Sequence, residues 1–293
     1  TSTTSRGVMT IDSNFGLPGT SNVSLKDRNG FLWFGTSNGL VRYDGANLEI
    51  YGSEQGLNAV NISDLFEDSK GRLWVLNGTD QMSVIDFEAK LIHDMRSDLN
   101  QSNRHGMMEA DDGTFWYSAV NYGYFIFDFE TKTLRNFNQD HGLLGGFNVV
   151  PFQDEQGLIW LTSNSGVNII DPQKKKQWQF TQKEGLLANF TGSVFQDDNK
   201  DIWITGGNGI TILNQDKTEV SYFKTENYLN GTWPITKVFK GSEGMYWLGT
   251  ANGFLFSFDK VNGLLRKHVL AGPRSNWVYK IIEDDHGVIW ASI

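Results

Sequence analysis

Hydrophobic and polar residues between positions 61 and 95 alternate in short runs that predict four strands. NISDLFED alternates approximately, and RLWVL is a continuous apolar run, as in a strand that is buried on both faces. Asp68 and Gly71 between these runs predict a tight hairpin, because Asp accepts a turn N–H and Gly adopts positive φ easily. SVIDF and KLIHDM predict the third and fourth strands. Four short antiparallel strands in about 42 residues are typical of a β-propeller blade.

This pattern recurs along the whole chain, and a tryptophan occupies the same place in every repeat. Successive tryptophans of this series are 41 to 44 residues apart, and the series contains seven of the ten tryptophans. They are Trp33, Trp74, Trp116, Trp160, Trp203, Trp247 and Trp290. A catalytic residue is needed once, whereas a structural residue is needed in every stacked unit. We therefore interpret these tryptophans as structural repeat anchors.

Turn residues keep a constant distance from the anchor tryptophans. An Asp precedes the anchor by six residues at Asp27, Asp68, Asp154, Asp197 and Asp284. The predicted third strands end on Asp44, Asp86, Asp128, Asp171, Asn214 and Asp259. A carboxylate that recurs at a turn needs no chemistry, because Asp side chains accept hydrogen bonds from turn backbone. We interpret these residues as turn caps and not as a catalytic set.

Seven anchors predict an all-β fold, a single seven-bladed β-propeller of four-stranded antiparallel blades over residues 1–293. The predicted blades are 22–51, 61–95, 103–137, 147–180, 190–223, 234–268, and 277–293 together with 8–11. The last repeat stops after its second strand, so the N-terminus is expected to supply the remainder. Stacked repeats bury their apolar residues against their neighbours and need no single large core.

The Gly-Leu pairs that follow the outermost strands predict which residues form the closing strand. GLP at 16–18 aligns with GLN at 56–58, which puts 8–11 at the place of an outermost strand. Pairing of 8–11 with the last blade would close the ring and remove exposed sheet edges. An alternative alignment of TSRGVMTID (4–12) with TSNGLVRYD (36–44) makes the same segment a third strand. Either alignment leaves the closing blade one strand short.

The composition of the chain excludes several kinds of function. The formal net charge of −9 argues against a nucleic-acid partner, since such proteins usually carry a basic patch. The chain has no cysteine, which excludes disulfides, thiolate metal sites and a cysteine nucleophile. No apolar stretch approaches the ~18 residues of a membrane span, and the N-terminal sequence is not that of a signal peptide. We expect no membrane contact within this segment.

The repeats resemble the two-component regulator propeller repeat. The motif is D-x-x-G-x-[IL]-W-[IFL]-[GT]-[TS]-x-x-G-[LV]-x-x-[IY]-D followed by GL, and residues 27–45 and 154–171 match it closely. WD40 repeats have the same period but end in Trp-Asp, and no Trp here precedes Asp; kelch repeats are longer. The second and third repeats depart from the motif, with Asp80 and Tyr122 at its glycine position.

The resemblance implies a sensor. Propellers of that family form the extracytoplasmic, periplasmic part of histidine kinases, many of them hybrid two-component systems of Bacteroidetes that respond to glycan breakdown products. Family members commonly carry two propellers, a small β-sandwich, a membrane helix and the kinase. The resemblance thus implies a non-catalytic domain in signal transduction. Its expected partners are a small-molecule or oligosaccharide ligand, further domains of the same receptor, and a second copy of the chain in a homodimer.

Two other functions stay open, a propeller enzyme and a protein-interaction scaffold. Streptogramin lyases look like a single propeller with similar blades and use a metal with a catalytic His, and several propellers are glycosidases. The histidines here are His93, His105, His141, His268 and His286, and no pair has the spacing of metal ligands. We predict no catalytic residue, no cofactor and no metal.

The candidate ligand site lies in the loops that lead into the innermost strands, because these loops vary while the rest of the repeat does not. Aromatic residues precede four anchors by 13 or 14 residues, at Phe147, Phe190, Trp233 and Trp277. The candidate set also contains Arg104, His105, Arg274 and, between a second and a third strand, Tyr122. Aromatic faces with Arg donors suit sugar rings. The alternative is that these aromatics fill gaps between blades, since large apolar side chains need burial with or without a ligand.

Overall fold

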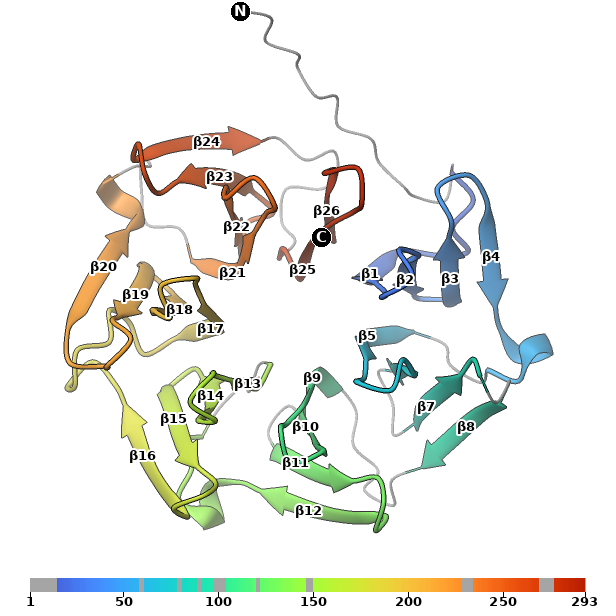
Figure 1. The fold of residues 1–293 in the computed structure, drawn as a ribbon, viewed down its shortest axis with the longest axis horizontal. Helices are drawn as coiled ribbons and strands as arrows, with labels where there is room; N and C mark the ends of the chain where they lie inside the picture. The colour runs from blue at the N-terminus through green and yellow to red at the C-terminus, as the bar shows by residue number, and fades with distance from the viewer. Residues whose placement is uncertain are drawn as a thin grey trace, which may run out of the picture.

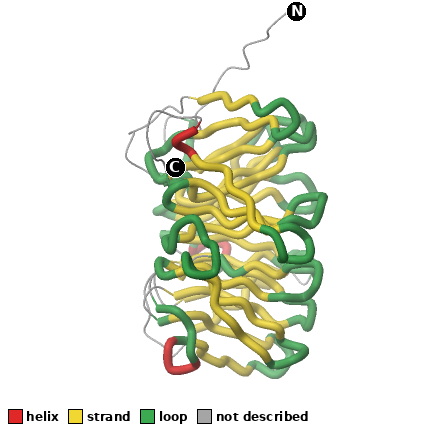
Figure 2. Tube along the Cα trace, turned by 90° about the vertical axis from the view of Figure 1, so that its left-hand side faces the viewer, coloured by secondary structure: helices red, strands yellow, loops and turns green. Residues whose placement is uncertain are grey.

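Each repeat forms an antiparallel sheet of short strands, and the sheets are arranged radially around one axis (Figure 1). The computed structural model describes residues 15–57, 61–77, 81–88, 91–96, 104–119, 122–145, 150–227, 234–268 and 277–292. Seen edge-on, the strands fill the middle of a disc and the loops project from its two faces (Figure 2).

Blades 1 to 3 come from the first half of the chain. Blade 1 contains β1 (Ser21–Lys26), β2 (Leu32–Thr36), β3 (Gly39–Tyr43) and β4 (Leu48–Tyr51). Blade 2 contains β5 (Ile62–Glu67), β6 (Leu73–Asn77), β7 (Gln81–Asp86) and β8 (Leu91–Arg96). Blade 3 contains β9 (Arg104–Glu109), β10 (Thr114–Ala119), β11 (Gly123–Asp128) and β12 (Thr133–Phe137).

Blades 4 to 6 and a smaller sheet complete the ring. Blade 4 contains β13 (Phe152–Gln153), β14 (Ile159–Ser163), β15 (Gly166–Asp171) and β16 (Lys176–Phe180). Blade 5 contains β17 (Thr191–Gln196), β18 (Ile202–Gly206), β19 (Gly209–Leu213) and β20 (Val220–Lys224). Blade 6 contains β21 (Ile235–Lys240), β22 (Tyr246–Thr250), β23 (Leu255–Asp259) and β24 (Leu264–His268). The last sheet contains β25 (Lys280–Glu283) and β26 (Ile289–Ser292). Short 3₁₀ turns follow three outermost strands: η1 (Ser53–Gln55), η2 (Gln139–His141) and η3 (Thr225–Asn227).

The prediction of seven four-stranded blades is wrong. The described residues form six blades, and the sheet that contains Trp290 has only two strands. The count of tryptophans overestimated the count of blades because the anchor lies on the second strand, so a two-stranded unit still carries one. The closing strand predicted at 8–11 lies outside the described residues.

The two-stranded sheet packs between blade 6 and blade 1 (Figure 1). Val278 and Ile281 cluster with Leu255 of blade 6. Ile282 clusters with Leu32 and Phe34 of blade 1, and the partly buried Trp290 packs against the same group. The Ser292 hydroxyl donates to Ser24 Oγ at 2.9 Å across this junction. Side-chain packing therefore joins the two ends of the described ring.

The apolar core is divided into clusters between neighbouring sheets, and the anchor tryptophans belong to them. Trp33 packs with Leu65 and Leu73 of blade 2. Trp160 packs with Ile202 and Ile204 of blade 5. Five anchors are at most 6% exposed, whereas Trp247 and Trp290 are half-buried. Each second strand thus directs its indole toward the next sheet.

The turn Asp and the anchor Trp form one hydrogen-bonded unit. In blade 4 the Oδ1 atom of Asp154 accepts from the backbone N–H groups of Gln156 and Leu158, both at 2.9 Å. Its Oδ2 atom accepts from Trp160 Nε1 at 2.9 Å. The same indole bond joins Trp33 to Asp27, Trp74 to Asp68, Trp203 to Asp197 and Trp290 to Asp284. One carboxylate therefore closes the hairpin and also orients the buried indole.

A belt of side chains at the ends of the innermost strands joins each sheet to the hairpin of the preceding one. Glu67 Oε2 accepts from the backbone N–H of Arg28 at 2.8 Å. The same bond links Glu109 to Ser69, Gln153 to Asp111, Gln196 to Glu155 and Glu283 to Ser242. At two junctions a lysine replaces the acceptor and an aspartate occupies the hairpin: Lys240 pairs with Asp198, and Lys26 with Asp285.

Candidate functional site

Strand order decides which loops share a face of the disc. Within each blade the strands follow the chain order and alternate in direction, with the first strand nearest the axis (Figure 1). The hairpins between first and second strands therefore lie on one face, which we call the lower face. The loops that lead into the innermost strands lie on the other, upper face, together with the turns between second and third strands. The candidate residues in those loops and turns belong to the upper face.

Phe190 and Trp277 lie together at this face although they come from different sheets. Phe190 precedes β17 of blade 5, and Trp277 precedes β25 of the two-stranded sheet. Their ring centroids are 5.9 Å apart with an interplanar angle of 81°, an edge-to-face contact. The Trp277 side chain keeps 39% of its surface exposed, and Tyr279, two residues later, keeps 49%. The contact orients Trp277 and leaves part of its indole open to solvent.

The other described candidate residues do not share in the contact between Phe190 and Trp277. Tyr122 lies in the turn before β11, is 48% exposed, and comes from a blade across the ring from β25 (Figure 1). Arg104 and His105 begin β9, where they pair with Ala119 and Ser118 of β10. The other members of the set, Phe147, Trp233 and Arg274, lie outside the described residues. Within the described part of the chain, the structure therefore brings together Phe190 and Trp277.

Charged residues on the innermost strands were missed by the sequence analysis. Lys237 of β21, Lys280 of β25 and Asp64 of β5 each precede the anchor of their own repeat by ten residues. The same position holds apolar or small residues in other repeats, such as Val23, Gly106 and Ser193. A comparison of the repeats at this position could have found them. They were missed because lysine in a strand is usually interpreted as solvent-facing.

The two lysines and the aspartate interact across the axis of the ring. Burial, and next the positive charge of Lys280, lower the pKa of Lys237 from 10.5 to about 8, and the negative charge of Asp64 opposes this shift. Asp64 is on the blade opposite β21 (Figure 1) and is 9% exposed, with Oδ1 accepting from the Leu65 N–H at 2.8 Å. The charged residues give the axial region a local excess of positive charge.

The described residues contain neither a metal-binding cluster nor a membrane-spanning helix. No group of three or more His, Asp or Glu side chains in the described ranges is arranged to hold a metal ion. None of the helical segments that the structure describes has the length and apolarity of a membrane span.

A family comparison identifies the repeat. Residues 56–79 match the family model described as two component regulator propeller. This stretch contains β5, β6 and the hairpin from Asp68 to Gly71. This one stretch matches the two-component regulator propeller repeat. The resemblance inferred from the sequence motif is thereby confirmed. No curated protein sequence matches the chain.

Solved structures similar to this chain include extracellular domains from B. thetaiotaomicron. The extracellular domain assigned to hybrid two component system BT3049 has a TM-score of 0.76 at 16% identity, over 97% of this chain and 40% of that one. The extracellular domain assigned to hybrid two component system BT4673 has a TM-score of 0.74 at 17% identity, over 96% and 40%. This chain therefore spans less than half the length of those domains. At such identities the likeness shows the fold.

An enzyme is also similar to this chain. A catalytically inactive virginiamycin B lyase from Staphylococcus aureus, in complex with quinupristin, has a TM-score of 0.74 at 13% identity. The match covers 93% of this chain and 92% of the lyase. Because receptor domains and an enzyme share the fold, function has to be argued from the site.

Proposed function

We propose that this propeller is the non-catalytic, ligand-sensing part of an extracytoplasmic two-component receptor, and that its ligand is a carbohydrate. The matched repeat and the likeness to extracellular domains of hybrid two component systems support the receptor assignment. The Phe190–Trp277 contact supports the ligand assignment, because it holds a partly exposed indole at the upper face.

The chemistry of this site fits a sugar ring. The open part of Trp277 offers an apolar surface on which the C–H face of a sugar can stack, and Tyr279 adds a second exposed aromatic with a hydroxyl. The contact with Phe190 restricts the indole before the ligand arrives, which lowers the entropy cost of binding.

In this proposal the propeller acts together with partners outside the chain. The bound ligand changes contacts between the upper face and further domains of the same receptor, or between two copies of the chain in a homodimer. A histidine kinase elsewhere in the receptor would read that change.

Calorimetric titration with a panel of oligosaccharides tests the proposal. We expect at least one oligosaccharide to bind, and Trp277→Ala to weaken its binding by ~1–3 kcal/mol, the usual loss for an exposed aromatic hot spot. Ile50→Ala is the control, because it removes another exposed apolar side chain, 48% exposed, from the outermost strand of blade 1. It should bind as the wild type does.

Thermal melting of both variants accompanies the titration. A large drop in the melting temperature of Trp277→Ala would show that the indole is needed for folding and would remove the ligand argument. Cleavage of a streptogramin by the purified chain would support the enzyme alternative instead. Binding of proteins but of no saccharide would support the scaffold alternative.

A further inference from the structure

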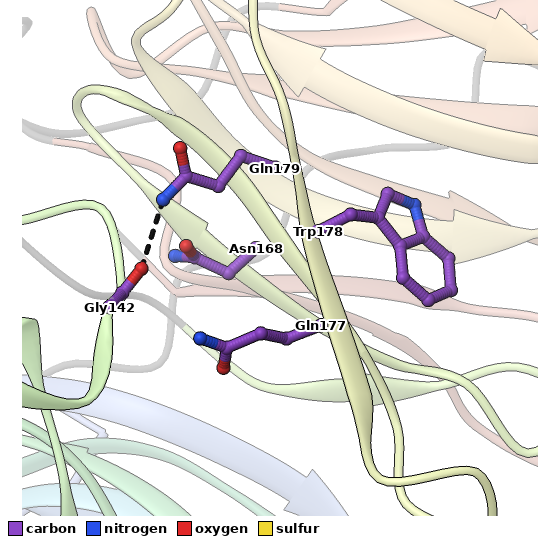
Figure 3. A pocket seen from close by; sticks show the side chains of 5 residues that line it. All are labelled: Gly142, Asn168, Gln177, Trp178 and Gln179. Atoms are coloured by element: carbon purple, nitrogen blue, oxygen red, sulfur yellow. Dashed lines mark hydrogen bonds between the residues drawn. The ribbon is translucent and has the colours of Figure 1, made fainter.

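A cavity of about 280 Å³ lies at the outer part of blade 4, away from the upper-face aromatics. Gly142, Asn168, Gln177, Trp178 and Gln179 line it. Figure 3 shows that the three amide side chains point toward Gly142, whereas the indole of Trp178 points to the other side of β16. The interior of the cavity is therefore bounded by amides and backbone.

Asn168 has a hydrogen-bond donor without a partner. Its side chain is 2% exposed, and its Oδ1 atom accepts from the backbone N–H of Leu144 at 2.8 Å. Its Nδ2 atom is buried and makes no hydrogen bond to any described residue. Buried donors in proteins almost always have a partner, so an acceptor from outside the chain is expected in the cavity.

Each of the two glutamines uses one of its two amide N–H donors and leaves its carbonyl acceptor. Gln177 Nε2 donates to the His141 carbonyl at 2.8 Å, and Gln179 Nε2 donates to the Gly142 carbonyl at 2.9 Å. These bonds fix both amides, so that their Oε1 atoms are available to a ligand. The cavity thus presents amide N–H donors together with two carbonyl acceptors and has no charged side chain in its lining.

Blade 5 shows that the fold does not require Asn at this position. The backbone N–H of Leu187, which corresponds to that of Leu144, donates to Thr211 Oγ1 at 2.9 Å. Thr211 pairs with Tyr222 in blade 5 as Asn168 pairs with Gln179 in blade 4. A threonine hydroxyl therefore suffices to hold the loop, and the Nδ2 group of Asn168 is not needed for that role.

The glutamines are also replaceable in blade 5. Tyr222 stands at the place of Gln179, and its hydroxyl donates to the Gly185 carbonyl at 2.9 Å. Val220 stands at the place of Gln177. Blade 5 thus closes the same junction with Thr, Tyr and Val, whereas blade 4 has three amides around a cavity.

We propose that this cavity is a second binding site, which takes one neutral sugar residue. Adjacent hydroxyls of a sugar both donate and accept, so they can satisfy the Asn168 donor and the two glutamine acceptors together. The absence of charge among the lining side chains disfavours sugar acids. The volume is near the lower limit of small-molecule pockets, about 300 Å³, which fits one sugar ring. The site is independent of the upper-face site.

Ligand-detected NMR with glucose, galactose, mannose and N-acetylglucosamine tests this assignment, with galacturonate as the charged comparison. We expect at least one neutral hexose to bind and galacturonate not to. Asn168→Thr keeps an acceptor for Leu144 but removes the amide donor, and it should weaken binding roughly tenfold, as expected for one lost hydrogen bond. The triple variant with Gln177→Val and Gln179→Tyr reproduces the blade 5 set and should abolish binding while it melts as the wild type does.

The outcomes separate this site from the proposed upper-face site. Trp277→Ala should leave hexose binding unchanged, and Asn168→Thr should leave oligosaccharide binding at the upper face unchanged. The proposal is overturned if none of the four neutral hexoses binds, which would leave water as the occupant. It is also overturned if hexose binding persists in the triple variant, or if it is lost in Trp277→Ala.

Discussion

Blades 4 and 6 differ in the residue that lies beside the indole N–H of the anchor tryptophan. In blade 4 the anchor Trp160 is fully buried and donates to the buried carboxylate of Asp154. In blade 6 the corresponding residue is Gly241, and the anchor Trp247 is only half-buried. No hydrogen bond of the Trp247 indole N–H is found among the described residues.

In blades 4 and 5 the next sheet supplies a cation to the buried carboxylate, whereas in blade 2 Arg72 of the same hairpin pairs with Asp68 at 2.6 Å. Lys217, from the turn between the third and fourth strands of blade 5, lies 3.3 Å from Asp154 Oδ2 and above the Trp160 ring. Lys260 of blade 6 does the same for Asp197 of blade 5 at 2.8 Å. Blade 6 is followed by a sheet that has no third or fourth strand in the described residues, and these residues place no equivalent lysine beside position 241. A carboxylate at position 241 would therefore be buried without a cation from the described part of that sheet.

Asp284 of the two-stranded sheet differs from Asp154 and Asp197. It bonds the Trp290 indole, although no lysine is paired with it in the described residues. Asp284 is half-buried, whereas Asp154 is 2% exposed. Water can solvate the more exposed carboxylate of Asp284, which lowers its need for a paired cation.

Removal of the anchor indole should have the largest effect on stability. Trp160→Ala should cost ~3–5 kcal/mol of unfolding free energy, because it empties a fully buried site. Trp247→Ala should cost less, because its indole is already partly solvated. Urea unfolding of both variants measures the difference, and equal losses would contradict the comparison.

Removal of the lysine should have the next largest effect. Lys217→Met should cost ~1–3 kcal/mol, because it leaves the Asp154 carboxylate buried without its cation. Lys260→Met should cost less, because Lys260 is 36% exposed against 17% for Lys217. Lys183→Met, at an exposed position, serves as the control in the same unfolding experiment. A loss in the control as large as in Lys217→Met would refute the pairing.

Insertion of the missing carboxylate should be unfavourable. A Cβ atom at Gly241 would lie 3.3 Å from both Glu283 Oε2 and Trp247 Nε1. Gly241→Asp should destabilise the protein by roughly 1–2 kcal/mol, because its charge would be buried beside another carboxylate. Gly241→Asn offers Trp247 a neutral acceptor and should have wild-type stability or slightly more. If the Asp variant is the more stable by thermal melting, the explanation from the missing lysine fails.

The smallest effect concerns Lys237 on the innermost strand of blade 6. Its lowered pKa means that the folded protein releases this proton near pH 8, whereas the unfolded chain keeps it to about 10.5. The unfolded state binds more protons in this window, so the contribution of Lys237 to stability rises with pH between about 8 and 10.5. Lys237→Met should raise Tm at pH 7 by about 2 °C. It should also remove the contribution of Lys237 to the rise in stability between about pH 8 and 10.5. Lys237→Arg should keep the free-energy cost of the buried positive charge both at pH 7 and at about pH 10.5, because a guanidinium group stays protonated at both.

The blade architecture was largely predictable from the sequence, because its determinants are local. The Asp and Gly of each hairpin and the apolar run around each tryptophan identified the first and second strands. The number of blades was not predictable from tryptophans alone, since the anchor of β26 gave no information on whether further strands follow. The bond from Trp160 to Asp154 was also missed, although both residues had been found at a fixed separation of six.

The candidate site was less predictable because its parts come from distant repeats. Phe190 and Trp277 were selected separately for their loop positions, but their contact depends on how far each loop reaches over blade 6. The interaction of Lys237 with Asp64 depends on the closure of the ring, which brings blades 2 and 6 to opposite sides of one axis. Such relations do not follow from a repeat period.

The belt of inter-blade contacts also restricts the order in which the repeats can be joined. If the blade containing Asp198 preceded the one containing Glu109, two carboxylates would meet at the junction. If the blade containing Ser69 preceded the one containing Lys240, two donors would meet. The repeats are similar in sequence but are not interchangeable. During folding, a blade that docks on the wrong neighbour loses the contact between its innermost strand and the neighbouring hairpin. The belt therefore favours one cyclic order of the blades.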